Sequence, residues 1–395
     1  MIIAGLMSGT SADGLDVALV EIRPDRERGA GPGELTLHLL DRQEMDFPDE
    51  LAHDILRLLE PYDVPLSLVS SVDARLGRLC ADAVTTTCAA AGATCDLVVM
   101  HGQTVRHDVS DGVVTSTWQL GQPAWVAEST GYPVLSDVRS RDVAAGGQGA
   151  PLASILDHLL LAGTGEPTAA LNLGGIANIT VVAPGRDTIA FDTGPANALV
   201  DLAARRILGS ERGFDRDGLL AARGEVSAPL LEDLLTEPYY RLPAPKSTGK
   251  ELFHGAYLDR FLAGRRDLDP HDVVATLTAL TARTVADACR DQGVGTVVAS
   301  GGGTRNPVLM AALRRELGPA VTLSTTDATF GLREGAKEAC LMALIGWLTW
   351  HGLPATLPSV TGASHGTVAG RLTPGAAPLR LPEPLIDLPA ALRVR

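Results

Sequence analysis

The chain has 395 residues, of which 45% are hydrophobic and 20% charged, and its formal net charge is −14. This length exceeds what one hydrophobic core usually serves and indicates two domains, while the composition is that of a globular protein rather than a disordered one. The acidic charge argues against nucleic acid and anionic membranes as partners, because binding to either depends mainly on Lys and Arg.

No segment predicts secretion or membrane insertion. The five cysteines are scattered without a C-x-x-C pair, and we interpret them as reduced structural residues. The first residues lack the basic and apolar regions of a signal peptide, and the longest apolar run, Ala339 to Trp350, is too short to span a bilayer. We therefore expect a cytoplasmic protein.

The chain opens with a hairpin pattern that recurs near its middle. An apolar strand from Ile2 to Leu6 is followed by a glycine-rich turn and a second strand from Leu15 to Ile22. Strand-like residues also flank the turn at 174–178, from Ala169 to Leu173 and from Ile179 to Ala183. The recurrence predicts two related halves that each begin with a hairpin.

Helices and buried strands are expected to alternate through the rest of the chain. The expected helices are Glu50 to Glu60, Ser67 to Ala91, Pro270 to about Gly293 and Pro307 to about Gly318. The expected strands are Asp96 to Met100, Thr188 to Phe191 and Thr296 to Ala299. This alternation predicts an α/β fold with mixed or parallel sheets, and after Gly352 we expect only loops.

Three glycine-rich turns are candidates for binding a nucleotide, because glycine lets backbone N–H groups approach phosphate oxygens. Each alone is also compatible with an ordinary turn. The candidate residues are Gly9, Thr10, Ser11, Ala12, Asp13, Gly14, Leu15 and Asp16 in the first, Gly174, Gly175 and Asn178 in the second, and Gly301, Gly302, Gly303 and Asn306 in the third. In the first turn, Asp13 or Asp16 could hold a hydrated Mg²⁺.

Three acidic or basic residues are candidates for catalysis or substrate binding. Asp192 follows a strand and precedes a Gly-Pro turn, which suits either a general base or a helix cap. Arg139 lies in a segment of two arginines, two aspartates and glycines at 136–151, which suits either an acidic sugar or a charged surface loop. Glu338 lies at the start of an apolar helix, which suits either a solvated carboxylate favoured by the helix dipole or a residue in a cleft. The run 245–250 lacks the leading glycine of a Walker loop, and we reject that interpretation.

Together these motifs resemble the anhydro-N-acetylmuramic acid kinase family from Gly5 to about Gly346. The matched strings are Gly-Leu-Met-Ser-Gly-Thr-Ser-x-Asp-Gly-x-Asp at 5–16, His-Gly-Gln-Thr at 101–104, the segment 137–151, and the runs 172–178, 191–197, 245–249, 300–306 and 337–339. The resemblance implies a two-lobed actin-like ATPase (ribonuclease H-like) α/β fold with an interdomain cleft, of the actin/hexokinase/Hsp70 type. It also implies ATP, Mg²⁺ and a homodimer.

The reaction implied by the resemblance joins 1,6-anhydro-N-acetylmuramic acid, ATP and water to give N-acetylmuramate 6-phosphate and ADP, a step in peptidoglycan recycling. By the same resemblance, Asp192 would be the general base that activates water at the anomeric carbon. Glu338 would orient water and sugar, and Thr104 and Arg139 would hold the substrate. In phosphoryl transfer a protein mainly positions groups and stabilises charge, which agrees with these roles.

Two other functions remain open, and the domain limits are approximate. One is a kinase of the same fold for another anhydrosugar, against which Arg139 argues because a neutral sugar offers its guanidinium no anion. The other is an actin-like or Hsp70-like ATPase scaffold without a sugar substrate. We expect a first lobe of residues 1–131 plus about 358–395 with the first phosphate loop. The second lobe, 132–357, would hold the catalytic Asp, the second phosphate loop and the adenosine-binding glycines.

Overall fold

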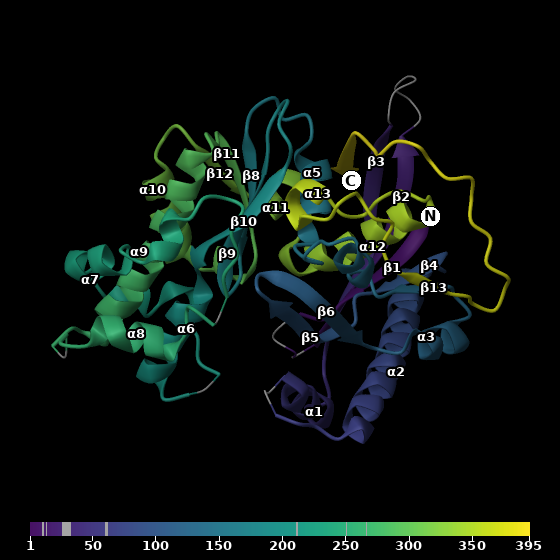
Figure 1. Ribbon diagram of the computed structural model, residues 1–395, viewed down its shortest axis with the longest axis horizontal. Coiled ribbons are helices and arrows are strands. Elements are labelled where there is room, and N and C mark those ends of the chain that lie inside the picture. The colour runs from purple at the N-terminus through teal and green to yellow at the C-terminus, as the bar shows by residue number, and fades with distance from the viewer. Residues whose placement is uncertain are drawn as a thin grey trace. The chain divides into compact units, whose positions relative to one another are not determined.

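The computed structural model describes residues 1–9, 12, 14–25, 33–59, 62–210, 212–249, 251–265 and 267–395, except for the side chain of Glu334. Thr10, Ser11 and Asp13, three of the expected nucleotide-loop residues, lie outside the described residues. The chain divides into two compact units: unit 1 is Met1–Ala162 with Phe330–Arg395, and unit 2 is Gly163–Thr329 (Figure 1).

Unit 1 contains a seven-stranded mixed sheet in the order β13-β7-β4-β1-β2-β3-β14. Its strands are β1 (Ile2–Met7), β2 (Gly14–Asp25), β3 (Glu34–Asp46), β4 (Leu97–Met100), β7 (Val134–Ser136), β13 (Arg371–Thr373) and β14 (Ala391–Val394). The strands β1, β4 and β7 run parallel, so their carboxyl ends lie at the same edge. A separate hairpin is formed by β5 (Gln103–Ser110) and β6 (Val113–Leu120).

Helices cover both faces of this sheet. One apolar core joins it to α5 (Ala153–Leu161) and α12 (Lys337–Trp350), and the other joins it to α1 (Asp49–Leu59), α2 (Leu66–Ala91) and α3 (Pro123–Thr130) (Figure 1). Two short helices complete the unit, α4 (Ser140–Ala144) and α13 (Pro358–Thr361). Nearly every residue of α12 is buried, so this helix is apolar on all sides rather than amphipathic.

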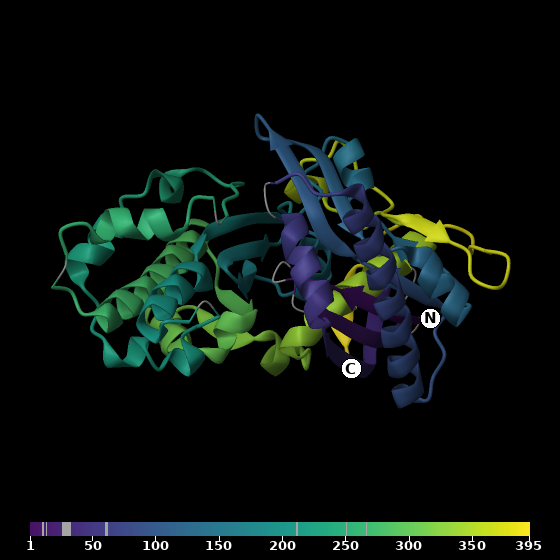
Figure 2. The same cartoon turned by 90° about the horizontal axis from the view of Figure 1, so that it is seen from below.

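Unit 2 contains a five-stranded sheet in the order β10-β9-β8-β11-β12. Its strands are β8 (Thr168–Leu173), β9 (Ile176–Val182), β10 (Ile189–Pro195), β11 (Thr296–Ser300) and β12 (Thr322–Thr325). Its helices are α6 (Asn197–Leu208), α7 (Ala228–Leu234), α8 (Gly255–Leu262), α9 (Pro270–Asp291), α10 (Pro307–Leu317) and, at the boundary with unit 1, α11 (Thr326–Phe330). The helices α9 and α10 pack on one face of the sheet, as Figures 1 and 2 show.

The two sheets repeat one topology. In unit 1 the strands β3-β2-β1-β4-β7 comprise an antiparallel meander followed by two parallel strands, and β10-β9-β8-β11-β12 of unit 2 have the same order and directions. The prediction of two related halves that each begin with a hairpin is therefore confirmed. The prediction of an α/β fold with two parts is confirmed with it.

The predicted helices and strands lie within a few residues of those observed. All five cysteines are free and buried, as expected. The expectation of loops only after Gly352 is wrong, because β13 pairs with β7 and β14 pairs with β3 at the two edges of the unit 1 sheet. These strands are only three and four residues long, and the pairing that stabilises them is with strands distant in sequence.

The compact units divide the chain at different residues from those expected near 131 and 358. Residues 132–162 and 330–357 belong to unit 1 because β7, α5 and α12 share its cores with β1 and β2. Arg139 and Glu338 are accordingly in unit 1, whereas Asp192 and the two later glycine turns are in unit 2.

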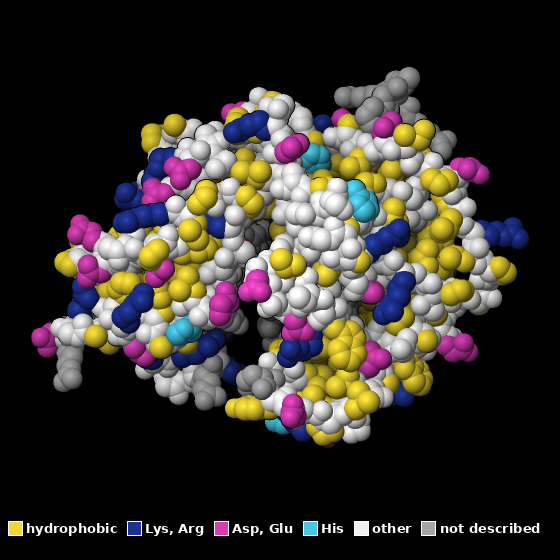
Figure 3. Space-filling view, in the orientation of Figure 1, with side chains coloured by type: hydrophobic (Ala, Val, Ile, Leu, Met, Phe, Trp, Pro, Cys, Tyr) yellow, Lys and Arg dark blue, Asp and Glu magenta, His cyan; other side chains and the backbone are white. Residues whose placement is uncertain are grey.

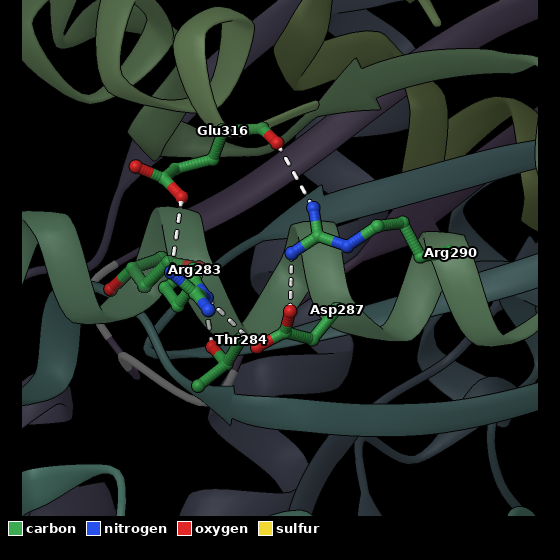
Figure 4. Close-up of polar contacts among 6 residues, drawn as sticks. Arg283, Thr284, Asp287, Arg290 and Glu316 are labelled. Carbon is green, nitrogen blue, oxygen red and sulfur yellow. Dashed lines mark hydrogen bonds and ion pairs between the residues drawn. The ribbon is translucent and has the colours of Figure 1, made fainter. Parts of the chain in front are cut away.

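Charged side chains on unit 2 form local pairs of opposite sign. Figure 4 shows that Asp287 of α9 accepts from Arg283, at 3.2 Å, and from Arg290, whose guanidinium also donates to the Glu316 carbonyl of α10 at 3.1 Å. In the view of Figure 3, basic and acidic side chains intermingle over the part of unit 2 that carries α7 to α10. Among the described residues, no helix is both long enough and apolar enough to cross a membrane.

We predict that Gly5→Ala destabilises unit 1. A Cβ on Gly5 would lie 2.0 Å from the carbonyl oxygen of Ala339 on α12, so helix and strand would have to separate. Overpacking of this kind costs about 1–3 kcal/mol or more. The midpoint of urea unfolding measures the loss, and Gly33→Ala is the matched control because its nearest contact is an ordinary 3.6 Å. Equal midpoints for the two variants would contradict the close packing of α12 on β1.

Candidate functional site

In unit 1, the polar candidates gather where three parallel strands end. Ser8 and Gly9 follow β1, the segment 101–104 follows β4, and Arg139 comes shortly after β7. Loops at the carboxyl ends of parallel strands are where open α/β sheets bind ligands. The sheet topology thus explains why three motifs that are distant in sequence lie close together.

The segment 101–104 links the loops on either side of it. The Nε2 of Gln103 donates to the Gly9 carbonyl at 3.4 Å, and its Oε1 accepts from the Ser8 hydroxyl. On the other side, the Nε of Arg139 donates to the Nε2 of His101 at 2.8 Å. His101 and Gln103 are buried, and sequence reasoning did not select either one, although both lie in the His-Gly-Gln-Thr motif.

Arg139 has only neutral hydrogen-bond partners. Besides His101, it donates from Nη1 to the Gly149 carbonyl at 2.7 Å, and within the described part of the chain no carboxylate lies at ion-pair distance from it. Burial lowers the pKa of Arg139 to about 10, and Glu338 raises it. The group still remains a cation at neutral pH, and although Glu338 acts on its charge, no described carboxylate pairs with it directly.

Glu338 and Thr104 also lie in unit 1. Glu338 is solvent-accessible in the first turn of α12, and desolvation by the surrounding protein raises its pKa while Lys337 and Arg139 lower it. The neighbouring Lys337 is buried and pairs with Asp157 of α5 at 2.7 Å, which fixes the start of the helix. The Thr104 hydroxyl accepts from the Gln119 side chain at 3.2 Å.

The first glycine turn is described only in part. Ala12 is buried with a left-handed φ of 55°, and its N–H donates to the Gly9 carbonyl at 3.2 Å. Gly14 is required by packing, since a Cβ there would lie 2.7 Å from the Met45 carbonyl of β3. The Leu15 side chain is in the core, and Asp16 continues β2 opposite Met7. The Gly9 carbonyl also accepts from Gln103, and Asp16 is the described one of the two acidic residues predicted to hold Mg²⁺.

In unit 2, Asp192 belongs to a polar row across the sheet. The strand register places Ser300, Asn172, Asn178 and Asp192 side by side on β11, β8, β9 and β10. A β-bulge follows Asp192, and such bulges redirect a side chain next to a site. The predicted residues Asn178 and Asp192 are thus neighbours.

The Asp192 carboxylate is held by one of its two oxygens. Oδ2 accepts from the Thr248 N–H at 2.9 Å and from the Ser247 hydroxyl at 3.1 Å, while Oδ1 makes no hydrogen bond to any described residue. Burial raises the pKa of Asp192, these two donors lower it and Glu251 raises it, with a net upward shift. One carboxylate oxygen is therefore without a hydrogen bond to the described residues, which is compatible with the predicted role of Asp192 as a general base.

The segment 245–249 therefore supports the candidate base. Lys246 anchors it by donating to the Tyr239 and Tyr240 carbonyls at 3.1 and 2.9 Å, and the Tyr239 hydroxyl donates to the Asp192 carbonyl at 2.8 Å. The sequence had indicated this segment only as one of the strings that resemble the family, after the Walker-loop interpretation was rejected. Nothing in its sequence indicated that Ser247 and Thr248 donate to the Asp192 carboxylate.

The glycines of unit 2 serve different purposes. A Cβ on Gly301 would lie 2.6 Å from the Asn172 Oδ1, and one on Gly303 would lie 2.7 Å from the Leu173 Cβ, so internal packing accounts for both. At Gly174 and Gly175 a Cβ would meet nothing closer than 3.5 and 3.8 Å, and neither has a positive φ. Neither packing nor backbone conformation explains that Gly-Gly pair, whereas close approach of a ligand would.

The remaining predicted residues of the third turn begin α10. Gly302 starts a 3-10 turn at 302–305, and the Asn306 side chain accepts from Val308 and Leu309 N–H at 3.0 and 3.1 Å. Asn306 is therefore an N-cap, and its amide nitrogen is the part left for a nucleotide. Nucleotide binding by this turn stays a prediction.

Comparisons with known proteins cover the full chain. The family model described as anhydro-N-acetylmuramic acid kinase matches residues 1–375. An anhydro-N-acetylmuramic acid kinase from Streptomyces coelicolor is 51% identical over 395 residues, covering 100% of this chain and 99% of the relative. One from Rhodococcus erythropolis is 45% identical over 402 residues, with 100% and 99% covered.

Solved structures are more distant. The activator of the 2-hydroxyisocaproyl-CoA dehydratase from Clostridium difficile, with bound ADPNP, is 13% identical with a TM-score of 0.41, and the match covers 87% of this chain and 93% of that one. The sequence matches therefore carry the assignment.

We predict that Asp192→Asn stabilises the fold near neutral pH. Because the folded state raises the pKa of Asp192, the ionised carboxylate opposes folding once the pH exceeds that raised pKa. Asn removes the charge and keeps an oxygen for Ser247 and Thr248. The melting temperature of the variant should exceed that of the native protein near neutral pH, and the difference should vanish below about pH 4.

The exposed Asp63→Asn serves as the control for this comparison, because its side chain makes none of these contacts. Its melting temperature should follow that of the native protein across the same pH range. A lower melting temperature for Asp192→Asn at every pH would show that the carboxylate is stabilising and is not held as a base.

Proposed function

Because the chain belongs to the anhydro-N-acetylmuramic acid kinase family, we propose that it converts 1,6-anhydro-N-acetylmuramate, ATP and water into N-acetylmuramate 6-phosphate and ADP. The observation that carries the mechanism is the Asp192 carboxylate, with Oδ2 fixed by two donors and Oδ1 without a described partner. This reaction would serve peptidoglycan recycling. Its use of ATP suits a cytoplasmic enzyme.

Asp192 acts on the water. Its Oδ1 accepts a proton as the water oxygen forms a bond to the anomeric carbon of the sugar. The bond from that carbon to the bridging oxygen breaks, and the bridging oxygen, now O6, takes the γ-phosphoryl group of ATP while ADP leaves. Asp192 then releases the proton to solvent. A base near the anomeric carbon, rather than near O6, is what this sequence of bond changes needs.

Unit 1 supplies the groups that recognise the sugar. The guanidinium of Arg139, which has no direct carboxylate partner among the described residues, binds the lactyl carboxylate. The Thr104 hydroxyl binds a polar group of the sugar, and Glu338 orients water and sugar. A charge-assisted contact to a carboxylate is stronger than a neutral one, which favours an acidic substrate. An anhydrosugar without a carboxylate is the alternative substrate, and Arg139 argues against it.

ATP and Mg²⁺ fit the donor groups present. The Gly174–Gly175 turn leaves room for the phosphates, and the turns at 9–16 and 301–306 bind the rest of the nucleotide. No cluster of three metal-binding side chains occurs among the described residues, but Mg²⁺ usually needs only one or two carboxylates in addition to substrate phosphates and water. Asp16 or Asp13 would hold the ion, which neutralises phosphate charge. We also propose a homodimer, which sedimentation would test.

The first prediction of this proposal concerns sugar dependence. Purified protein with Mg-ATP should release ADP only when 1,6-anhydro-N-acetylmuramate is present, and Asp192→Asn should lose activity by about 10²-fold or more while remaining folded. A coupled ADP assay measures both. Equal ADP release without sugar would favour an ATPase scaffold, and activity with an uncharged anhydrosugar alone would overturn the substrate assignment.

The second prediction concerns pH. The Ser247 hydroxyl lowers the pKa of Asp192, so Ser247→Ala should raise that pKa further and shift the acidic limb of kcat/KM to higher pH. Activity at high pH, where Asp192 is ionised in both proteins, should change little. Ser247→Thr keeps the hydroxyl and is the matched control. If the acidic limb of kcat/KM does not shift in the Ala variant, the Ser247 hydroxyl does not affect the pKa of the catalytic base.

A further inference from the structure

The guanidinium of Arg139 is fixed without being neutralised. Its Nε–H goes to the His101 Nε2 at 2.8 Å and an Nη1–H goes to the Gly149 carbonyl at 2.7 Å. Arginine has five N–H donors, so these two contacts leave the others for a further partner. A largely desolvated arginine usually pairs directly with a carboxylate. Glu338 acts on the Arg139 charge and raises its pKa, but no described carboxylate lies at hydrogen-bond or ion-pair distance from the guanidinium.

The acceptor nitrogen on His101 is determined by its second contact. His101 Nδ1 lies 2.7 Å from the Gly102 carbonyl, which can only accept, so Nδ1 carries the hydrogen and Nε2 keeps its lone pair for Arg139. His101 is 3% exposed, and its burial together with the Arg139 charge lowers its pKa to about 3. The imidazole is therefore neutral at any physiological pH.

Both acceptors are held by their own surroundings. Gly102 has a left-handed φ of 77°, and a Cβ on it would lie 2.6 Å from the Leu120 carbonyl, so the backbone beside His101 has little freedom. The Gly149 N–H donates at 2.8 Å to Asp142, whose other oxygen accepts from Thr361 at 2.9 Å. Arg139 is thus oriented by two rigid, uncharged groups.

We propose that His101 is a positioning residue, which by accepting the Nε–H of Arg139 holds the guanidinium in one orientation and leaves its charge available to the carboxylate of an acidic sugar. The inference rests on the proposed function and adds a determinant of substrate specificity to it. A carboxylate at position 101 would orient Arg139 as well but would neutralise it. Charge neutrality at position 101 is therefore as important as the hydrogen bond.

Three substitutions separate these two requirements. His101→Gln offers a neutral acceptor, His101→Glu offers a charged one of nearly the same shape, and His101→Leu offers none. Leu leaves Arg139 without its orienting acceptor, and Glu neutralises the guanidinium, so both weaken the contact of Arg139 with the sugar carboxylate. Hydrogen bonds to charged groups contribute about 1.5–3 kcal/mol, so we expect both variants to raise KM for 1,6-anhydro-N-acetylmuramate by about tenfold or more. The Gln variant should stay within a few-fold of the native protein. KM for ATP should be unchanged in all three.

The control for general damage is His351→Leu. His351 also lies in unit 1 and bonds to a backbone carbonyl, that of Trp347, but it has no contact with Arg139. It should leave KM for the sugar unchanged. Melting temperatures confirm folding, and the comparison of Gln with Glu remains informative if the Leu variant does not fold.

The outcomes separate this inference from the proposed function. If the native protein shows no sugar-dependent ADP release, the proposed function fails before any variant is compared. If the native protein is active but Gln and Glu have the same KM for the sugar, or if Leu matches the native protein, His101 does not position Arg139. A rise in KM for ATP equal to that for the sugar would also overturn the inference, since it would indicate general damage.

Discussion

The position of Glu338 depends on how closely α12 lies against β1. Gly5 on the strand lets the helix backbone approach, and on the helix Gly346 does the same, because a Cβ there would lie 2.3 Å from the Val99 side chain. Since every residue of α12 between Glu338 and Trp350 is buried, the helix has no solvent face along which to shift. The Lys337–Asp157 ion pair then fixes its first turn, so the Glu338 backbone is set by the core rather than by a loop.

The other candidate residues are likewise positioned by the packed core rather than by loops alone. Each unit has strands whose carboxyl ends meet at one edge, and the polar residues follow those ends or lie in adjacent rows of the sheet. The rigid scaffold fixes where each loop starts, and a few side chains fix the loops themselves: Gln103 joins 101–104 to Gly9, Asp142 holds 142–149, and Lys246 holds 245–249. Candidate binding residues thus rest on supports that are buried or bonded to backbone.

Local sequence predicted the hairpins, the long helices and the buried strand β4, because periodicity and capping residues such as Asp269 and Asn306 are local signals. It did not predict β13 and β14, whose pairing partners are distant in the chain. The compact units also divide the chain at residues other than the expected limits near 131 and 358, because α5 and α12 pack against strands that are distant in sequence. The hydrogen-bond partners of the candidate residues could not be predicted from local sequence either. Nothing adjacent to Asp192 indicates Ser247, 55 residues away, and nothing adjacent to Arg139 indicates Gly149 as an acceptor.

Asp192 and Arg139 are both charged residues whose hydrogen-bond partners are uncharged. Asp192 is bound by donors that carry no charge, and Arg139 by acceptors that carry none. Partly buried charges normally cost stability unless an opposite charge compensates them. Pairing either group within its own unit would therefore be the more stable arrangement, and it would also remove the free oxygen of the base or the free charge of the cation. The neutral partners fix both groups while leaving their charges for a ligand, so the lost stability is itself the physical sign of a site.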